Sequence, residues 1–302
     1  MANLLKTMLN EVGLDARLVW VGTSRLSYTN TFPSLVVHNH MICAVNLNNN
    51  FIFLDPTDRY SNIGEIGDHI HQQLAMIEDG DSYIIDTIPK TDYTDNTITA
   101  NYGMILCDDI LYIEGTISYL GEPRRNIQHL LNEYLGTYKK ELLESLITNN
   151  NKKYNVEEIM FGIDSLNPSN FEVQVKMSAK NSVFSHDGQL LVPMDLGYGW
   201  PFPEIDTARS FHFNMGIRAL KKYRTILTLP DSSSVIFLPS EIKKTINGAS
   251  FRYSWKQIKN TVVFDKEINL VNKIIEPDDF KKWNSFIQEY KEAANQMIII
   301  SD

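Results

Sequence analysis

The residues best suited to chemistry are a histidine and an aspartate on either side of an asparagine-rich run. His40 lies in one apolar segment, Asp55 ends a second, and residues 46–50 separate them. Asparagine tolerates positive φ and favours two-residue turns, so we expect a hairpin that reverses at Asn48-Asn49. Side chains alternate along strands, and counting outward from this turn places Asp55 on the face of His40 as its diagonal neighbour. A loop one residue longer would place Asp55 on the opposite face.

A histidine held by a carboxylate is the arrangement that acid–base and nucleophilic catalysis require. The carboxylate fixes the tautomer and stabilises the imidazolium, while the other ring nitrogen exchanges a proton with a nucleophile. Cys43 fails as that nucleophile because it occupies an odd position of the strand and points away from His40. Both Cys43 and Cys107 are expected to be small buried hydrophobes. The sequence therefore offers a base and its positioning residue without a visible nucleophile.

The elements expected to position this pair are one helix and three strands. Apolar residues recur at helical spacing before Gly13, which predicts a helix already running, without a cap, at the first residues. Apolar runs predict strands over residues 17–21, 34–45 and 51–54. The polar segment 90–96 is expected to be a linker, which gives domains 1–92 and 93–302.

The second domain is predicted to be mostly β. Alternation over residues 104–120 predicts strands, and many short alternating segments between 171 and 270 favour a β-sandwich. A helix is expected over about 124–148 and another over about 277–293. The second helix carries an apolar stripe that is expected to pack into the core: Phe280, Trp283, Phe286 and Tyr290.

The segments around the pair, and the first residues of the chain, carry a resemblance to a known family. Residues 2–17, Asn39-His40 and the segment Leu54-Asp55-Pro56-Thr57 are similar to the transglutaminase-like proteins of the papain-like superfamily. The resemblance implies an α+β fold: the C-terminal half of a transglutaminase-like unit, followed by a β-sandwich domain of unknown function. It also implies a Cys–His–Asp triad in which His40 and Asp55 match the last two members.

The same resemblance places the nucleophilic cysteine at the N-terminus of the first helix, where the helix dipole lowers the pKa of a thiol. It is therefore expected just upstream of Met1, in a segment that this sequence lacks. Either the sequence starts at an internal methionine of a longer protein, or the natural protein is a truncated relative. The full-length protein would be a cysteine acyl-transfer enzyme, of peptidase or transglutaminase type, acting on peptide or glutamine amides. The chain as given is expected to be inactive. The alternative is a non-catalytic envelope binding or assembly module.

Composition limits the partners. The chain has 302 residues, with 28 Lys and Arg against 37 Asp and Glu, a formal net charge of −9. An acidic chain without a basic run is not expected to bind nucleic acid, and no apolar run is long enough to span a membrane. We expect a protein or peptide as substrate or partner, with no cofactor and no metal; the oligomeric state stays open. The family resemblance implies a bacterial, periplasmic or extracellular protein, although no signal peptide is visible.

Several other histidines and two tryptophans are candidate site residues. The segment Asp68-His69-Ile70-His71 could suggest a metal site, but histidines at i and i+2 share a face only in a strand, so an exposed polar loop is expected. His38 would share a strand face with His40 and is expected to pack at the rim of the site. Two tryptophans are expected in core or interface packing rather than in a cleft: Trp20 and Trp200.

Overall fold

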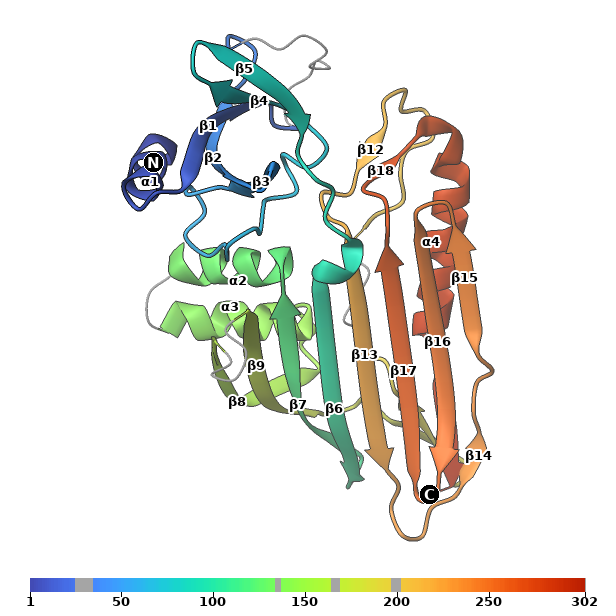
Figure 1. The fold of residues 1–302 in the computed structure, drawn as a ribbon. Coiled ribbons are helices and arrows are strands. Elements are labelled where there is room, and N and C mark those ends of the chain that lie inside the picture. Colours follow the sequence, from blue (N-terminus) through green and yellow to red (C-terminus); the bar gives the residue numbers. More distant parts are fainter. Residues whose placement is uncertain (25–34, 134–136, 164–168, 197–201, 302) are drawn as a thin grey trace. The chain divides into compact units, whose positions relative to one another are not determined.

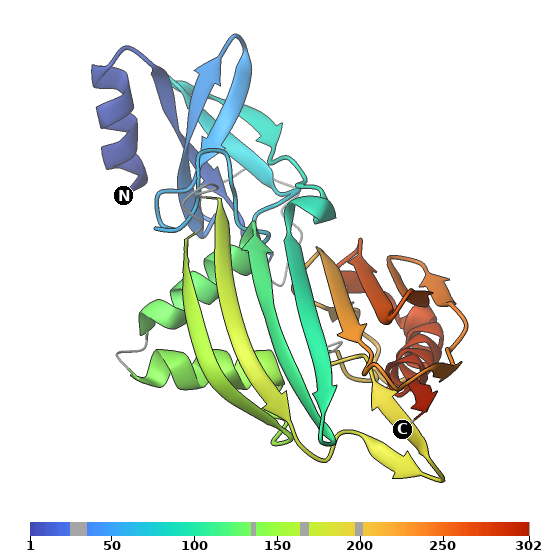
Figure 2. The same ribbon diagram turned by 90° about the horizontal axis from the view of Figure 1, so that it is seen from below.

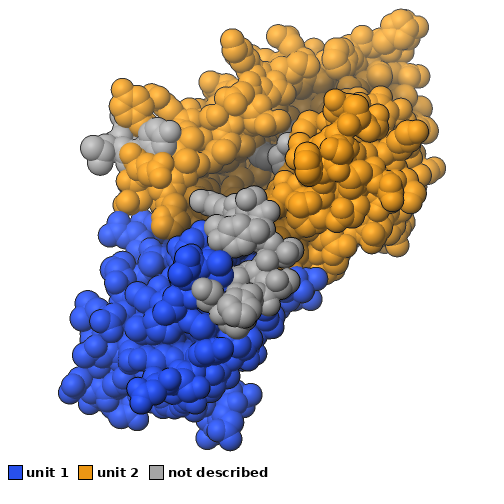
Figure 3. Space-filling model, turned by 90° about the horizontal axis from the view of Figure 1, so that it is seen from above, with its two compact units in different colours: residues 1–92 blue, residues 93–302 orange. Residues whose placement is uncertain are grey.

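The computed structural model describes residues 1–24, 35–133, 137–163, 169–196 and 202–301. The chain divides into two compact units, Met1–Asp92 and Tyr93–Asp302, which Figure 3 shows in different colours. The polar segment 90–96 spans this division. Both units are rich in strands, in keeping with a sheet-rich α+β fold.

Unit 1 is an antiparallel five-stranded sheet with a helix on one face (Figure 1). Its strand order is β3-β2-β1-β4-β5. The elements are α1 (Ala2–Glu11), β1 (Asp15–Val21), β2 (His40–Leu47), β3 (Asn50–Leu54), β4 (Leu74–Asp79) and β5 (Ser82–Thr87). Alternation divides the buried side chains between the two faces. Ala16, Cys43 and Val45 lie under α1, and the opposite face packs against Ile66 and Ile70 of the segment between β3 and β4.

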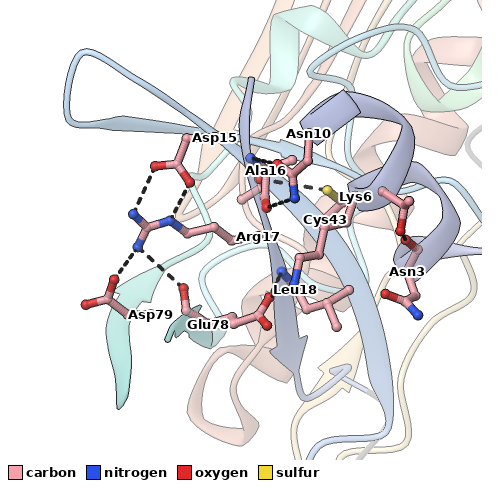
Figure 4. A network of polar contacts seen from close by, with 12 residues as sticks. Asn3, Lys6, Asn10, Asp15, Ala16, Arg17, Leu18, Cys43, Glu78 and Asp79 are labelled. Atoms are coloured by element: carbon pink, nitrogen blue, oxygen red, sulfur yellow. Dashed lines mark hydrogen bonds and ion pairs between the residues drawn. The ribbon is translucent and has the colours of Figure 1, made fainter. Parts of the chain in front are cut away.

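Polar contacts attach α1 to the sheet (Figure 4). Lys6 Nζ lies 2.5 Å from Glu78 Oε2, and the same oxygen accepts a backbone N–H of β1. The side chain of Asn10 accepts the N–H of Ala16 at 2.8 Å and donates to its carbonyl at 3.2 Å. The helix is thereby held over the face that contains Cys43.

Unit 1 differs from the sequence-based prediction in two places. The strand predicted over 34–45 begins at His40, residues 35–37 form a turn, and residue 34 lies outside the described residues. The β4–β5 hairpin was not predicted. It reverses at Gly80, whose φ is +62°, and nearly every residue of β5 is exposed, so this edge strand has no strong apolar pattern.

Unit 2 contains an eight-stranded sheet of order β15-β16-β17-β13-β6-β7-β9-β8. The β13–β6 pair is parallel and every other pair in this sheet is antiparallel. The strands are β6 (Thr97–Cys107), β7 (Ile110–Leu120), β8 (Tyr154–Ile163), β9 (Asn170–Ala179), β13 (Ala219–Thr228), β15 (Ile242–Ile246), β16 (Ala249–Ile258) and β17 (Thr261–Leu270).

Helices and a second sheet complete unit 2 in a sandwich-like arrangement around one continuous core (Figures 1 and 2). Helices α2 (Glu122–Glu133) and α3 (Thr137–Thr148) lie by β7 and β8, and α4 (Phe280–Ala294) lies by β15. The second sheet consists of β10 (Phe184–His186), β11 (Gln189–Pro193), β19 (Met297–Ser301) and β14 (Val235–Phe237). The smaller elements are η1 (Tyr93–Asp95), η2 (Pro277–Asp279) and the paired strands β12 (Phe213–Asn214) and β18 (Ile274–Ile275).

The predicted apolar stripe of α4 is buried in this core, since Phe280, Trp283, Phe286 and Tyr290 are all at most 5% exposed. None of the helices in the described part of the chain is long and apolar enough to cross a membrane.

The helix predicted over about 124–148 is instead two helices, α2 and α3. Gly136, a weak helix former, lies in the sequence between them. Residues 134–136 of the predicted helix lie outside the described residues, as does Trp200. Strands β8, β15 and β19 were not predicted.

Replacing Gly121 with alanine is expected to destabilise unit 2. Gly121 joins β7 to α2 with a φ of +66°, and a Cβ there would overlap the carbonyl oxygen of Asp95. Gly188 is a matched control, because its φ is +72° and a Cβ there would meet no atom within 4 Å. Both substitutions carry the cost of a left-handed backbone, but only the first adds overpacking against backbone, about 2 kcal/mol. Urea unfolding should show that difference; equal losses for the two variants would contradict it.

Candidate functional site

The hairpin that carries the site turns where the sequence predicts. Asn48 and Asn49 have φ values of 53° and 63°, as a type I′ turn requires at both central positions. Leu47 pairs with Asn50, and the ladder continues to Cys43 opposite Leu54. The predicted register is therefore confirmed.

The register brings His40 and Asp55 together. His40 Nε2 lies 2.7 Å from Asp55 Oδ2, so the predicted contact between imidazole and carboxylate is confirmed. The Asp55 side chain is 3% exposed and that of His40 is 18% exposed. The ring is thus partly accessible, while its carboxylate partner is covered.

Thr57 fixes the carboxylate from its other side. Asp55 Oδ1 accepts the backbone N–H of Thr57 at 3.0 Å and its hydroxyl at 2.6 Å. Burial raises the pKa of Asp55, but the hydrogen bonds from His40 and Thr57 lower it more, and the net pKa lies below the ordinary value. The carboxylate is therefore ionised at neutral pH and acts only as an acceptor. It follows that His40 Nε2 carries the proton and Nδ1 is left as the basic nitrogen.

This assignment predicts the tautomer of His40. Long-range ¹H–¹⁵N correlation spectra of the chain at a pH where the imidazole is neutral should show a protonated Nε2 and an unprotonated Nδ1. The exposed ring of His186 has 83% of its side-chain surface accessible and serves as the internal reference. A protonated Nδ1 at His40 would contradict the assignment, because an ionised carboxylate cannot donate to the ring.

The segment before β2 is also fixed by a side chain. Asn39 Oδ1 accepts the backbone N–H of Thr23 at 2.9 Å, and its amide donates to the Thr23 hydroxyl at 3.0 Å. Sequence reasoning did not assign this role to Asn39, and its position next to His40 was the available signal. His38 precedes β2, so the argument that it shares a strand face with His40 does not apply. Its ring nitrogens are buried without a hydrogen-bond partner in the described part of the chain.

The segment Asp68-His69-Ile70-His71 is not the exposed loop that was expected. The side chains of Asp68 and His71 are each 3% exposed, and His71 Nδ1 lies 3.0 Å from Asp68 Oδ1. His71 Nε2 lies 2.8 Å from the hydroxyl of Thr91. His69 instead places its ring edge-on to that of His40, with 5.5 Å between the centroids. The two histidines of this segment therefore have different neighbours: His71 contacts Asp68 and Thr91, and His69 lies beside His40.

The two cysteines have different environments. Cys43 is fully buried beneath α1, on the face opposite His40 as predicted, and burial raises the pKa of its thiol. Cys107 was expected to be buried and is exposed at the end of β6, because its position in the alternation of β6 belongs to the solvent-facing side. Trp20, expected to pack in the core or at an interface, is half-buried in β1.

Comparison with known protein families finds one match, which covers part of the chain. A domain of unknown function with a solved structure, DUF3858, matches residues 192–300, less than half of the chain and within unit 2. No curated protein matches the chain.

The whole chain is similar in fold to a crystal structure from Parabacteroides distasonis ATCC 8503 that is described as a "putative protease". The TM-score is 0.52 at 11% sequence identity, and the match covers 100% of this chain and 43% of that one. At this identity the likeness establishes the fold and nothing finer. The chain thus spans less than half the length of the protein it resembles.

Proposed function

We propose that His40 and Asp55 are the acid–base half of a Cys–His–Asp acyl-transfer site of peptidase or transglutaminase type. The observation that carries the proposal is the 2.7 Å contact between His40 Nε2 and Asp55 Oδ2, on a carboxylate already held by Thr57. A base whose ring is fixed through one nitrogen, so that the other can exchange a proton, is what thiol activation requires. The fold likeness to a structure described as a "putative protease" is in keeping with it.

The nucleophile in this proposal is the cysteine expected upstream of Met1. Its thiolate would attack the carbonyl carbon of a peptide or glutamine amide, and His40 Nδ1 would protonate the departing nitrogen. Water or an amine would then displace the thiolate from the acyl group, with His40 accepting the proton. Asp55 would hold the ring and stabilise its charged form throughout. The family resemblance adds a periplasmic or extracellular setting to the proposal.

The test compares this chain with the protein translated from the in-frame codons upstream of Met1. The longer protein should cleave peptide substrates, or incorporate a fluorescent amine into a glutamine-containing protein, and a thiol-blocking reagent should abolish that activity. Residues 1–302 alone should show no thiol-dependent turnover. The absence of a cysteine from the upstream segment, or turnover that survives thiol blocking, would overturn the proposal.

A further inference from the structure

A second histidine extends the pair into a three-residue cluster. One ring nitrogen of His40, a carboxylate oxygen of Asp55 and one ring nitrogen of His69 all lie within 4.8 Å of one another. Among the described residues, these three side chains form a group of histidine and carboxylate ligands that lie close enough together to bind one metal ion. We infer that His40, Asp55 and His69 bind a divalent first-row transition metal ion of the Zn²⁺ type.

The donor set fits such an ion. Two imidazoles and one carboxylate are typical ligands of zinc sites that keep a fourth position open for water or substrate. The single carboxylate leaves a net positive site once a divalent ion is bound, so the open position would favour water, hydroxide or an anionic group. Softer thiolate ligands are absent from the cluster, and calcium and magnesium prefer oxygen ligands.

The distances require only side-chain movement. Ligand atoms in a tetrahedral zinc site lie about 3.3 Å apart, as bond lengths of about 2.0–2.1 Å imply. The nitrogen and oxygen of His40 and Asp55, at 2.7 Å, must separate slightly as the ion replaces the proton they share. The ligand nitrogen of His69 must approach by no more than about 1.5 Å, because the three ligand atoms already lie within 4.8 Å of one another, and a change of side-chain torsion is enough for a shift of this size.

The surroundings hold Asp55 in place and leave room for the ring of His69. Asp55 Oδ1 is bound by Thr57, so Oδ2 is directed to the ion, the outer-shell support that metal-binding carboxylates commonly have. Gly67 makes room for the ring of His69, because a Cβ at residue 67 would lie 2.5 Å from both Cε1 and Nδ1 of that ring. The local backbone is thus compatible with this placement of His69 only without a side chain at residue 67.

The test is a titration of the chain with Zn²⁺ after treatment with a chelator. Calorimetry should show one ion per chain, and His69→Ala should weaken this binding at least about tenfold, since a ligand is lost. Gly67→Ala is the second variant. It retains all three ligand residues but displaces the ring of His69, so it should also weaken the binding of Zn²⁺. His186→Ala, at an exposed histidine in unit 2, should bind as the unaltered chain does.

Binding of equal strength in the unaltered chain and in a folded His69→Ala variant would overturn the inference, and so would the absence of stoichiometric binding. Circular dichroism establishes that each variant is folded, and Gly67→Ala provides the comparison if His69→Ala is not. The zinc titration needs no thiol, so its failure would leave the acyl-transfer proposal standing. Failure of the longer protein to turn over substrate would likewise leave the metal site standing.

Discussion

If the proposed upstream cysteine is present, replacing Asp55 with asparagine is expected to lower kcat/KM of the longer protein by about 10⁴-fold, the cost of the wrong histidine tautomer in a catalytic triad. Asp55 Oδ1 accepts two hydrogen bonds from Thr57. The amide oxygen of asparagine would take that place, which turns the NH₂ group toward His40. Nε2 would then have to accept, and the neutral ring would carry its proton on Nδ1. The nitrogen needed as base would be blocked.

The same substitution can be followed in residues 1–302 without any activity. The tautomer of His40 should change from Nε2–H to Nδ1–H in Asp55→Asn, in the ¹H–¹⁵N spectra described above. His40→Ala in the longer protein should lower kcat/KM by at least as much, because the base itself is removed. His186→Ala, far along the sequence in unit 2, is the control and should leave turnover unchanged. A fully active Asp55→Asn protein with an unchanged tautomer would contradict the role of Asp55.

Replacing Asp195 with alanine is expected to cost about 3–5 kcal/mol of stability, because it leaves a buried charge without its partner. Lys266 is 1% exposed, and its Nζ lies 2.9 Å from both carboxylate oxygens of Asp195. Burial lowers the pKa of Lys266, but Asp195 and Tyr290 together raise it more, and the net pKa is above the ordinary value. Tyr253 also donates to Asp195 at 3.1 Å, and the ammonium lies 4.9 Å from the ring centroid of Tyr223.

Two further variants separate the charge from the packing. Combining Asp195→Leu with Lys266→Met should recover most of the loss, since apolar replacements of a buried ion pair are often neutral. Lys176→Met breaks the solvent-exposed pair with Glu158 and should change the unfolding midpoint little. Chemical unfolding followed by tryptophan fluorescence provides the measurement. A loss in Asp195→Ala no larger than that in Lys176→Met would show that Lys266 is not held charged in the core.

The parts of the site that could be predicted from sequence depend on local rules. The Asn48-Asn49 turn fixes the hairpin register, and the period of two along strands then places Asp55 beside His40 and Cys43 on the other face. The position of His69 beside His40 could not be predicted in this way. It depends on the path of the segment between β3 and β4 across the sheet, which no local periodicity encodes.

The fold shows the same division. The stripe of α4 was predicted because four large apolar residues recur at helical spacing. Strand β8 was missed because its burial is low along its length and Glu157 and Glu158 interrupt its apolar residues. Strand β5 was missed for a similar reason. Edge strands such as these are fixed by pairing with a neighbour, and their own sequence carries a weak signal.

The central claim, that His40 held by Asp55 serves as the base for a thiol, is tested most directly by alkylation. The rate at which iodoacetamide modifies the proposed upstream cysteine of the longer protein should be measured against pH, with and without His40→Ala. A free thiol has a pKa of about 8.5, and pairing with an imidazolium lowers that pKa well below this value. We predict rapid alkylation well below that pH, lost in the His40→Ala variant. An identical pH profile in the two proteins would contradict the account.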